Sequence, residues 1–549
     1  VRGISEKYKL NLRAVDMVGR RYSCIDDSLS DLDHDGFYFS CEKKRKTETC
    51  EYYGNGKGYS TAQEAKANSL FEKVLEKYGS AKSHSELVDL GKKHFACPYE
   101  WMIKSASIAN VIIADYYHLM IPQIRDIFLL KIKKKIENSI IIVDEAHNLP
   151  KRVRDHLSST ITTFMLSRAE KEMALVGAEK TELYVDFCKW AKQTLQKSRE
   201  LLVQKSVLMD FFVSKGLSYD DFSVFLEQVG NDFIERTNKK SACLKISAFL
   251  KSWIKEEPGS IRTLKEQGTN YILSKKFLDP SNATSFLNNA HSVILMSGTL
   301  LPLEMHRDLI GLNPWRTKLK KYNSPFNEKN SMNLIVEGVT TRYSKRNYEL
   351  YSEIASRLDK IIRASPDGVA LFFPSYRVLN SVLPLLEGHN LLIQQESMLP
   401  SETADLIRKF KSGGVLCGVQ GGSLSEGIDY SNGEIKTAVI IGIALEEPSL
   451  ETNALIEYYQ EKYGKGWEYG YTYPAIIKAL QAAGRGIRKE SDRAAIVFMD
   501  ERFNWKNYKS ILDDGRTFIV TSEPERYVEK FWSKGQTSNS SNSLGTKTS

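Results

Sequence analysis

The sequence predicts an α/β protein built on parallel β-sheets. In its second half, short apolar runs such as Val369–Phe373 and Thr437–Ile441 alternate with helical segments such as Leu350–Ile362, as in doubly wound folds. These runs are apolar at every position, which is typical of parallel strands covered on both faces. The composition, with 42% apolar and 26% charged residues, excludes a disordered, collagen-like or coiled-coil chain.

Length and cysteine content set further bounds. At roughly 100–200 residues per domain, 549 residues predict three or four domains. Seven cysteines are too few for a disulfide-stapled scaffold, and no apolar run is long enough to span a membrane. We therefore expect a soluble protein of a reducing compartment. The net charge of +9, from 77 basic and 68 acidic residues, fits a nucleic-acid partner without establishing one.

The first 150 residues combine cysteines with strand and helix signals. Thr61–Tyr78 has the periodicity of a helix, while Asn110–Ala114 and Ser139–Val143 have the pattern of buried parallel strands. From about 150 to 285 the periodicity is helical, for example over Leu183–Val203 and Val207–Phe225. We expect a mostly helical inserted domain there.

Strand signals then return. Ser292–Met296 reads as a buried strand, and the segment after residue 310 continues with Val415–Gly418, Ala494–Phe498 and the helix Ala475–Ala482. Residues 533–549 are mostly Ser, Thr, Asn and Gly, which predicts a disordered tail.

An acidic motif, Asp144-Glu-Ala-His147, follows the strand Ser139–Val143. Carboxylates that end a parallel strand lie at the sheet edge where ligands bind in open α/β folds. There Asp144 can hold the Mg²⁺ that bridges nucleotide phosphates, and Glu145 can activate the attacking water. The alternative is an acidic turn without chemistry, but the preceding run of four β-branched residues favours a nucleotide site.

A second motif is Gln481-Ala-Ala-Gly-Arg-Gly-Ile-Arg488. Arg485 and Arg488 are three residues apart, so we expect them on one helix face, where two guanidinium groups suit a polyphosphate. The alternative is a solvated basic helix end. Two weaker signals are the loop Gln420–Asp429, with three glycines, and Ser297-Gly-Thr299 after a strand. Taken alone, each is better explained as an ordinary surface turn.

Four of the seven cysteines, Cys24, Cys41, Cys50 and Cys97, lie in the first fifth of the chain. Four thiolates can hold an iron–sulfur cluster or a structural zinc ion, and the spacing does not choose between them. Four unrelated cysteines are the remaining alternative. The chain contains no Gly-x4-Gly-Lys-Ser/Thr motif, so it has no P-loop to bind nucleotide phosphates.

In this order, the motifs resemble those of the XPD family of superfamily 2 iron–sulfur DNA helicases. The resemblance runs from about Gly19 to Asp500 and includes Cys97-Pro-Tyr99 and Phe372-Phe-Pro-Ser-Tyr376. It implies two RecA-like parallel-sheet motor domains, with an Fe–S insertion and a helical Arch insertion that together enclose a pore for single-stranded DNA. The implied boundaries are 1–23 for a remnant of motor domain 1, 24–97 for the Fe–S domain, 98–150 and 286–310 for motor domain 1, 151–285 for the Arch and 311–532 for motor domain 2.

The resemblance also assigns roles to residues. The four cysteines would ligate a [4Fe–4S] cluster, Asp144 would hold Mg²⁺, and Glu145 would activate the hydrolytic water. The groups that couple nucleotide state to DNA, or line the nucleotide cleft, would be His147, Ser297, Thr299, Glu426, Gly427 and Asp429. Gln481, Arg485 and Arg488 would reach the γ-phosphate of ATP.

The implied function is an ATP-dependent 5′ to 3′ DNA helicase that translocates on single-stranded DNA in DNA repair. Single-stranded and forked DNA, together with repair proteins, would be its partners. We expect a monomer that does not bind membranes, cytoplasmic in a prokaryote or nuclear in a eukaryote. The alternatives are an Fe–S nucleic-acid-binding module without ATPase activity and a zinc-stabilised DNA-binding protein.

The family places its P-loop ahead of the first cysteine, yet only 23 residues precede Cys24. A βαβ unit of roughly 30 residues is therefore missing. We expect the sequence to be a fragment whose natural chain begins upstream of Val1; the rival is a relative that lacks the P-loop.

Overall fold

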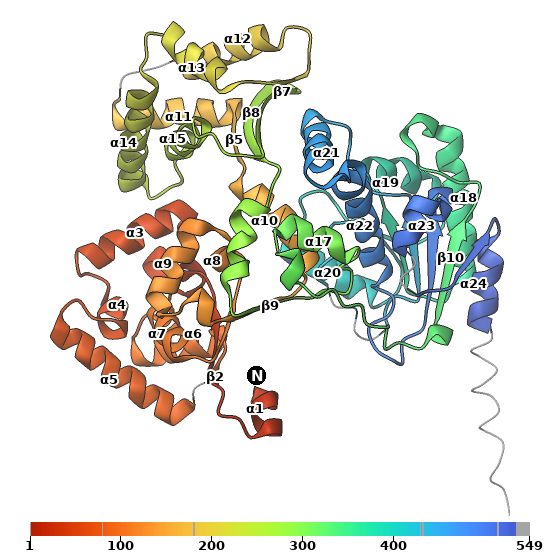
Figure 1. The fold of residues 1–549 in the computed structure, drawn as a ribbon, viewed down its shortest axis with the longest axis horizontal. Coiled ribbons are helices and arrows are strands. Elements are labelled where there is room, and N and C mark those ends of the chain that lie inside the picture. Colours follow the sequence, from red (N-terminus) through yellow and green to blue (C-terminus); the bar gives the residue numbers. More distant parts are fainter. Residues whose placement is uncertain are drawn as a thin grey trace, which may run out of the picture. The chain divides into compact units, whose positions relative to one another are not determined.

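The computed structural model describes residues 2–79, 81–178, 182–428, 430, 433–512 and 515–533. The chain divides into two compact units, one of Val1–Met296 and Leu309–Asn313, the other of Ser297–Asp308 and Pro314–Ser549 (Figure 1). The predicted tail, apart from Ser533, lies outside the described residues. None of the helices described could cross a membrane.

The first unit contains two small parallel sheets. In one, β1 (Ala14–Met17) lies between β2 (Ala81–Lys82) and β3 (Val111–Ala114). In the other, β4 (Ile140–Val143) pairs with β9 (Ser292–Leu295), with Ile140 opposite Ser292 and Val143 opposite Leu295. The strand β9, which follows a long insertion, therefore lies beside β4, the strand that directly precedes Asp144.

The prediction that β4 is buried on both faces is wrong. Ile141 and Val143 are buried, but Ile140 is 63% and Ile142 59% exposed. On β9, Ile294 is exposed as well. The reason is that the strands of this unit form two separate sheets, and the described residues cover only one face of the β4–β9 pair.

The cysteine-bearing region is helical. Its helices are α3 (His34–Lys46), α4 (Glu51–Gly56), α5 (Thr61–Tyr78), α6 (His84–His94) and α7 (Pro98–Ile108). The predicted helix at Thr61–Tyr78 is confirmed: Ser60 accepts a hydrogen bond from the Gln63 amide at its start, and Gly79 ends it with φ 78°. Its buried residues Phe71 and Val74 join a core around Trp101.

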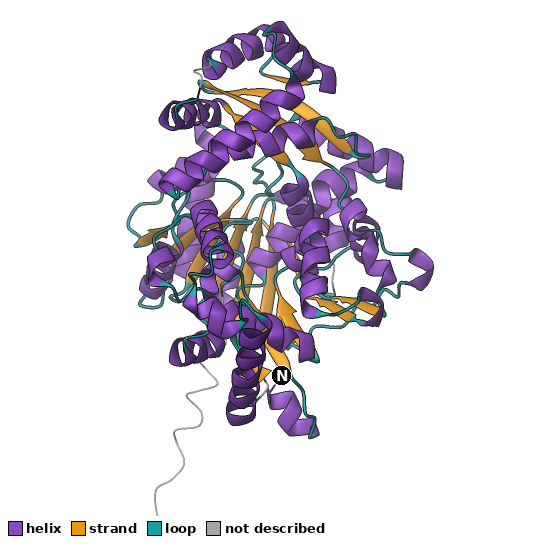
Figure 2. Cartoon of the chain, turned by 90° about the vertical axis from the view of Figure 1, so that its left-hand side faces the viewer, coloured by secondary structure: helices purple, strands orange, loops and turns teal. Residues whose placement is uncertain are grey.

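The longer helices among the described residues of the inserted domain are α10 (Leu149–Leu157), α11 (Thr163–Val176), α12 (Leu183–Leu195), α13 (Lys205–Ser214), α14 (Tyr219–Thr237) and α15 (Ala242–Trp253). Strands accompany them (Figure 2). They form an antiparallel sheet in the order β5 (Ser159–Thr162), β8 (Asn270–Phe277), β7 (Ser260–Gln267), β6 (Glu200–Leu202).

The prediction of a mostly helical domain missed this sheet, and the predicted helix Leu183–Val203 ends at Leu195. Polar side chains at inward positions hide the alternation of β7 and β8. Lys275 is fully buried, and its Nζ donates to the Ser252 and Lys255 carbonyls and to Glu257. In the sequence, a lysine whose buried ammonium group is hydrogen-bonded in this way cannot be told from an exposed polar residue.

The second unit is built on one seven-stranded, all-parallel sheet. Its order is β12 (Leu391–Ile393), β13 (Val415–Val419), β11 (Val369–Phe373), β14 (Thr437–Ile441), β15 (Ala494–Met499), β10 (Ser331–Val336) and β16 (Phe518–Thr521). Residues of β11, β13, β14 and β15 are buried throughout, as predicted.

Apolar side chains from both faces of this sheet enter separate cores, with α18 (Tyr348–Ala364), α19 (Tyr376–Val382) and α24 (Pro524–Ser533) on one face and α22 (Tyr473–Ala483) and α23 (Lys506–Leu512) on the other. The remaining long helices are α20 (Pro400–Phe410) and α21 (Leu450–Tyr463). The loops that leave the carboxyl ends of the strands lie at the edge where ligands bind in folds of this kind.

Candidate functional site

The acidic motif lies at the carboxyl end of β4, and hydrogen bonds with other segments hold its backbone in place. The Ala146 amide donates to the Met296 carbonyl at 3.1 Å, which joins the ends of β4 and β9. The Tyr116 hydroxyl donates to the Asp144 carbonyl. Glu145 has φ 48°, a left-handed conformation that costs free energy in residues other than glycine.

The side chains of this motif are brought together. The Glu145 amide donates to the Asp144 carboxylate at 2.9 Å, and the Glu145 carboxylate lies 3.3 Å from Nδ1 of His147. The His147 side chain is only 5% exposed, whereas that of Glu145 is 61% exposed. Asp144 and Glu145 can therefore bind a ligand from solvent, while the buried His147 contacts the Glu145 carboxylate and restrains its orientation.

In the second unit, the structure places Ser297 and Thr299 in one turn, where the Thr299 amide donates to the Ser297 hydroxyl at 3.1 Å. The loop after β13 contains Glu426 and Gly427, the latter with φ 77°. Asp429, also predicted for this loop, lies outside the described residues.

Arg485 binds the loop after β13. Its Nε donates to the Ser425 carbonyl at 2.8 Å and its Nη1 to the Ile428 carbonyl at 2.7 Å. The two motifs that were predicted separately therefore meet, and Arg485 fixes the backbone that carries Glu426 and Gly427.

The prediction that Arg485 and Arg488 share a helix face is wrong. The helix α22 ends at Ala483, and both arginines lie in the turn beyond it. A Cβ at Gly486 would lie 2.9 Å from the Ala494 Cβ, so this turn needs a glycine to pass close to β15. Gln481 is buried on α22, whereas Arg488 is exposed and its amide donates to Asp492.

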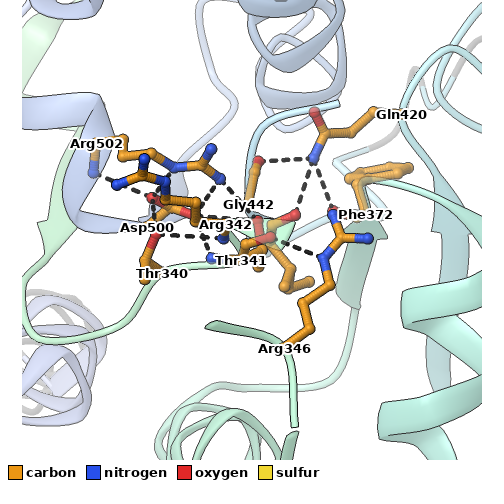
Figure 3. Close-up of polar contacts among 10 residues, drawn as sticks. Thr340, Thr341, Arg342, Arg346, Phe372, Gln420, Gly442, Asp500 and Arg502 are labelled. Carbon is orange, nitrogen blue, oxygen red and sulfur yellow. Dashed lines mark hydrogen bonds and ion pairs between the residues drawn. The ribbon is translucent and has the colours of Figure 1, made fainter. Parts of the chain in front are cut away.

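A buried network at the carboxyl edge of the second sheet was not predicted (Figure 3). Asp500 directly follows β15 and accepts hydrogen bonds from the Thr341 amide and hydroxyl, at 2.7 and 3.1 Å. Arg502 donates to Asp500 and to the Thr341 hydroxyl. The sequence could have pointed to Asp500, because this residue directly follows an apolar strand, as Asp144 does.

Gln420 extends the same edge. Its amide nitrogen lies 3.3, 3.1 and 3.0 Å from the carbonyl oxygens of Phe372, Ile441 and Gly442, at the ends of β11 and β14 (Figure 3). A buried amide that bridges strand ends holds the loops above them in register.

The four cysteines line one pocket in the first unit, although 73 positions separate the first from the last along the chain. Arg20, Lys44 and Arg45 line it too. At Gly56, a Cβ would lie 2.7 Å from the Cys97 amide nitrogen, and this amide donates to the Tyr52 carbonyl. The backbone on both sides of the pocket is therefore tightly packed.

Burial raises the pKa of the pocket thiols. The pKa of Cys24 rises to about 11 and that of Cys97 to about 12, and the pKa of Cys50 is raised as well. Thiolates need a metal cation here, because metal binding displaces the thiol proton. Among the described residues, no group of three or more His, Cys, Asp or Glu side chains is placed to hold a metal ion.

Two family models match the chain, DEAD_2 over residues 2–166 and the Helicase C-terminal domain over residues 358–515. The ATP-dependent DNA helicase CHL1 of Scheffersomyces stipitis is 25% identical over 79% of this chain and 60% of that protein. The general transcription and DNA repair factor IIH helicase subunit XPD/RAD3 of Saccharomyces cerevisiae is 24% identical over 85% of this chain and 70% of that protein. The chain thus spans about three fifths of the CHL1 relative.

Solved structures show the same fold. One titled XPD_Helicase matches with a TM-score of 0.60 at 20% identity, over 93% of this chain and 86% of that one. Another, titled XPD_APO, matches with a TM-score of 0.54 at 18% identity, over 94% of this chain and 99% of that one.

Proposed function

Because the chain belongs to the XPD family of superfamily 2 helicases, we propose that it is the larger part of an ATP-dependent DNA helicase that acts in DNA repair. The observation that carries this proposal is the grouping of Asp144, Glu145 and His147 at the carboxyl end of β4. We further propose that it moves 5′ to 3′ along single-stranded DNA and engages forked DNA and repair proteins. Cytoplasm or nucleus, where DNA is found, would be its compartment.

In the proposed mechanism, Asp144 holds the Mg²⁺ of MgATP and Glu145 accepts a proton from the attacking water. The exposed Glu145 carboxylate can reach a water, while His147 restrains it from one side. The bound metal would supply charge stabilisation of the transferred phosphoryl group.

The second unit would respond to the γ-phosphate through Gln481, Arg485 and Arg488. Arg485 already holds the Ser425 and Ile428 carbonyls. A guanidinium group that shifts toward phosphate would therefore pull on the loop of Glu426, Gly427 and Asp429. We propose that this shift, with Ser297 and Thr299, couples ATP hydrolysis to movement along DNA.

We also propose that Cys24, Cys41, Cys50 and Cys97 ligate a [4Fe–4S] cluster. The shared pocket supports this, as do Arg20, Lys44 and Arg45, whose positive charges offset that of an anionic cluster. Zinc would need a tighter grouping of thiolates than a cluster does, because its four ligands lie at about 2.3 Å from one ion. Iron-specific visible absorbance of the purified protein would support the cluster; a colourless protein with one equivalent of zinc would contradict it.

Hydrolysis also needs a phosphate-binding loop, which the 549 residues do not contain. Ile140, Ile142 and Ile294 are exposed on β4 and β9, whereas both faces of parallel sheets are normally covered.

The second candidate is a DNA-binding Fe–S module without ATPase activity, favoured by the missing P-loop. A titration of the 549-residue chain with MgATP tests this module, because tight binding would contradict it.

The experiment for the main proposal compares Glu145→Gln with wild type, in a protein that includes the phosphate-binding loop. We expect DNA-stimulated ATP hydrolysis to fall at least 100-fold, the usual effect of losing a general base, while MgATP still binds. Glu137→Gln, at an exposed position before β4, should change nothing. Unchanged hydrolysis in Glu145→Gln would refute the role of Glu145.

A further inference from the structure

The segment 338–348 runs across the carboxyl edge of the second sheet. It leaves β10 and passes β15, where the Glu501 amide donates to the Val339 carbonyl at 2.8 Å. It then passes β14, where a Cβ at Gly442 would lie 2.1 Å from the Thr341 hydroxyl oxygen. The segment therefore lies directly on the strand ends.

Several hydrogen bonds hold this segment in place. Thr341 is bound through its amide, hydroxyl and carbonyl groups, by Asp500, Arg502 and Arg346 respectively; the Arg346 Nε donates to its carbonyl at 2.9 Å (Figure 3). Asp500 is fully buried. The backbone just before Tyr343 is therefore preorganised.

Tyr343 nevertheless projects into solvent, with 69% of its surface exposed. The guanidinium carbon of Arg346 lies 5.6 Å from the centre of its ring, and that of Arg377, on α19, lies 5.8 Å away. We call Tyr343, Arg346 and Arg377 the Tyr343 platform. Guanidinium groups from two different elements thus lie close to one exposed aromatic ring.

The segment that carries Tyr343 is positively charged. Between Gly338 and Tyr348 the segment carries Arg342, Lys345 and Arg346 but no acidic residue. Within the described part of the chain, neither Arg346 nor Arg377 forms an ion pair with a carboxylate. An exposed ring beside unneutralised guanidinium groups has the chemistry that binds a nucleic-acid base and its phosphate.

We propose that the Tyr343 platform stacks a base of single-stranded DNA, with Arg377 and Arg346 contacting the adjoining phosphates. This proposal rests on the proposed function, because it specifies where the second unit holds the strand. The fixed backbone reduces the entropy lost on binding, since only the side chains need to be ordered. Stacking tolerates any base, which suits a protein that moves along DNA.

The test measures fluorescence anisotropy of a labelled oligothymidylate bound by the 549-residue protein, and by its variants. Tyr343→Ala should weaken binding about tenfold, within the range for one stacked base, and Tyr343→Trp should preserve binding. Arg377→Gln should lower the slope of log Kd against log salt by about one, as expected for one lost phosphate contact. Tyr348→Ala removes a similarly exposed tyrosine five positions along that has no arginine near its ring, and should bind as wild type does.

An oligonucleotide that contains abasic sites separates stacking from charge. Wild type should bind it more weakly than oligothymidylate, whereas Tyr343→Ala should bind both equally. If Tyr343→Ala matched wild type on both ligands, the platform would be refuted while DNA binding stood. If wild type bound neither ligand, the platform and the proposed function would both fall. Because Tyr343 is exposed, its variants should melt at the wild-type temperature.

Discussion

Gly36 on α3 lies against Asn238, the residue that ends α14, so closely that a Cβ at position 36 would lie 1.8 Å from the Asn238 carbonyl oxygen. This approach joins the cysteine-bearing helices to the inserted domain. Ser40 donates to the Asn238 side chain at 2.8 Å, and Lys43 pairs with Glu235 at 2.8 Å.

Gly36→Ala should separate these two elements, because backbone atoms block the added methyl group and cannot move aside as a side chain could. We expect faster amide hydrogen exchange in α3 and at residues 235–240, with little change in the second unit. Gly19→Ala, whose nearest described neighbours lie at 3.7 Å or beyond, is the matched control. Equal exchange in both variants would show that the contact does not hold the domains together.

Asp33 makes the same contact dependent on pH. Partial burial raises its pKa, but hydrogen bonds from the Gly36 and Lys240 amides outweigh this and hold the pKa below its ordinary value of 3.8. Its contribution to stability is therefore present above pH 3.8 and lost as the pH falls through the lower pKa of the folded state. Asp33→Asn should loosen α3 at neutral pH, measured by hydrogen exchange; an effect seen only in acid would contradict this.

Gly442→Ala should destabilise the second unit. The methyl group would meet Thr341 at 2.1 Å, and the residue has φ 67°. We expect a loss of about 3 kcal/mol, combining overpacking with left-handed strain. Gly464 has the same φ of 67° but nothing within 4 Å of a Cβ, so Gly464→Ala isolates the strain, about 1 kcal/mol. Chemical denaturation measures both, and equal losses would mean that Thr341 yields easily.

Glu172 organises the inserted domain from a buried position. It accepts hydrogen bonds from the Ser241 hydroxyl and from the Ala242 and Cys243 amides at the start of α15. Glu172→Ala leaves these donors unpaired and should reduce the free energy of unfolding by about 3 kcal/mol. Lys171→Ala, at the exposed neighbouring position, should have almost no effect. The thermal unfolding of the two variants checks this, and similar melting temperatures would contradict it.

Cys97 tests the proposed cluster through its removal. Because Cys97 closes the pocket beside Gly56, Cys97→Ser should lose most iron and visible absorbance. Cys188→Ser, outside the pocket, should retain both. Chelation of iron from wild type should loosen α3 and α4, which carry Cys41 and adjoin Cys50. A Cys97→Ser variant with full iron content would rule out Cys97 as a ligand.

Local pattern was sufficient for many elements. The strands Val369–Phe373 and Thr437–Ile441 and the helix Thr61–Tyr78 have the predicted bounds. The helix is buried on one face and the strands on both faces, so helical periodicity or uniform apolarity marks these elements in the sequence. The sheet of the inserted domain escaped prediction because Lys275 and Arg262 occupy inward positions, where backbone carbonyls satisfy their charges.

The sequence by itself determined the α/β class, the acidic motif at a strand end and the set of cysteines, because each depends on residue type and local spacing. The tertiary structure alone decided which of them meet. It placed four cysteines around one pocket, bound Arg485 to the loop after β13, and brought Arg346 and Arg377 close to the ring of Tyr343. Such relationships arise from the packing of distant segments, which no local pattern encodes.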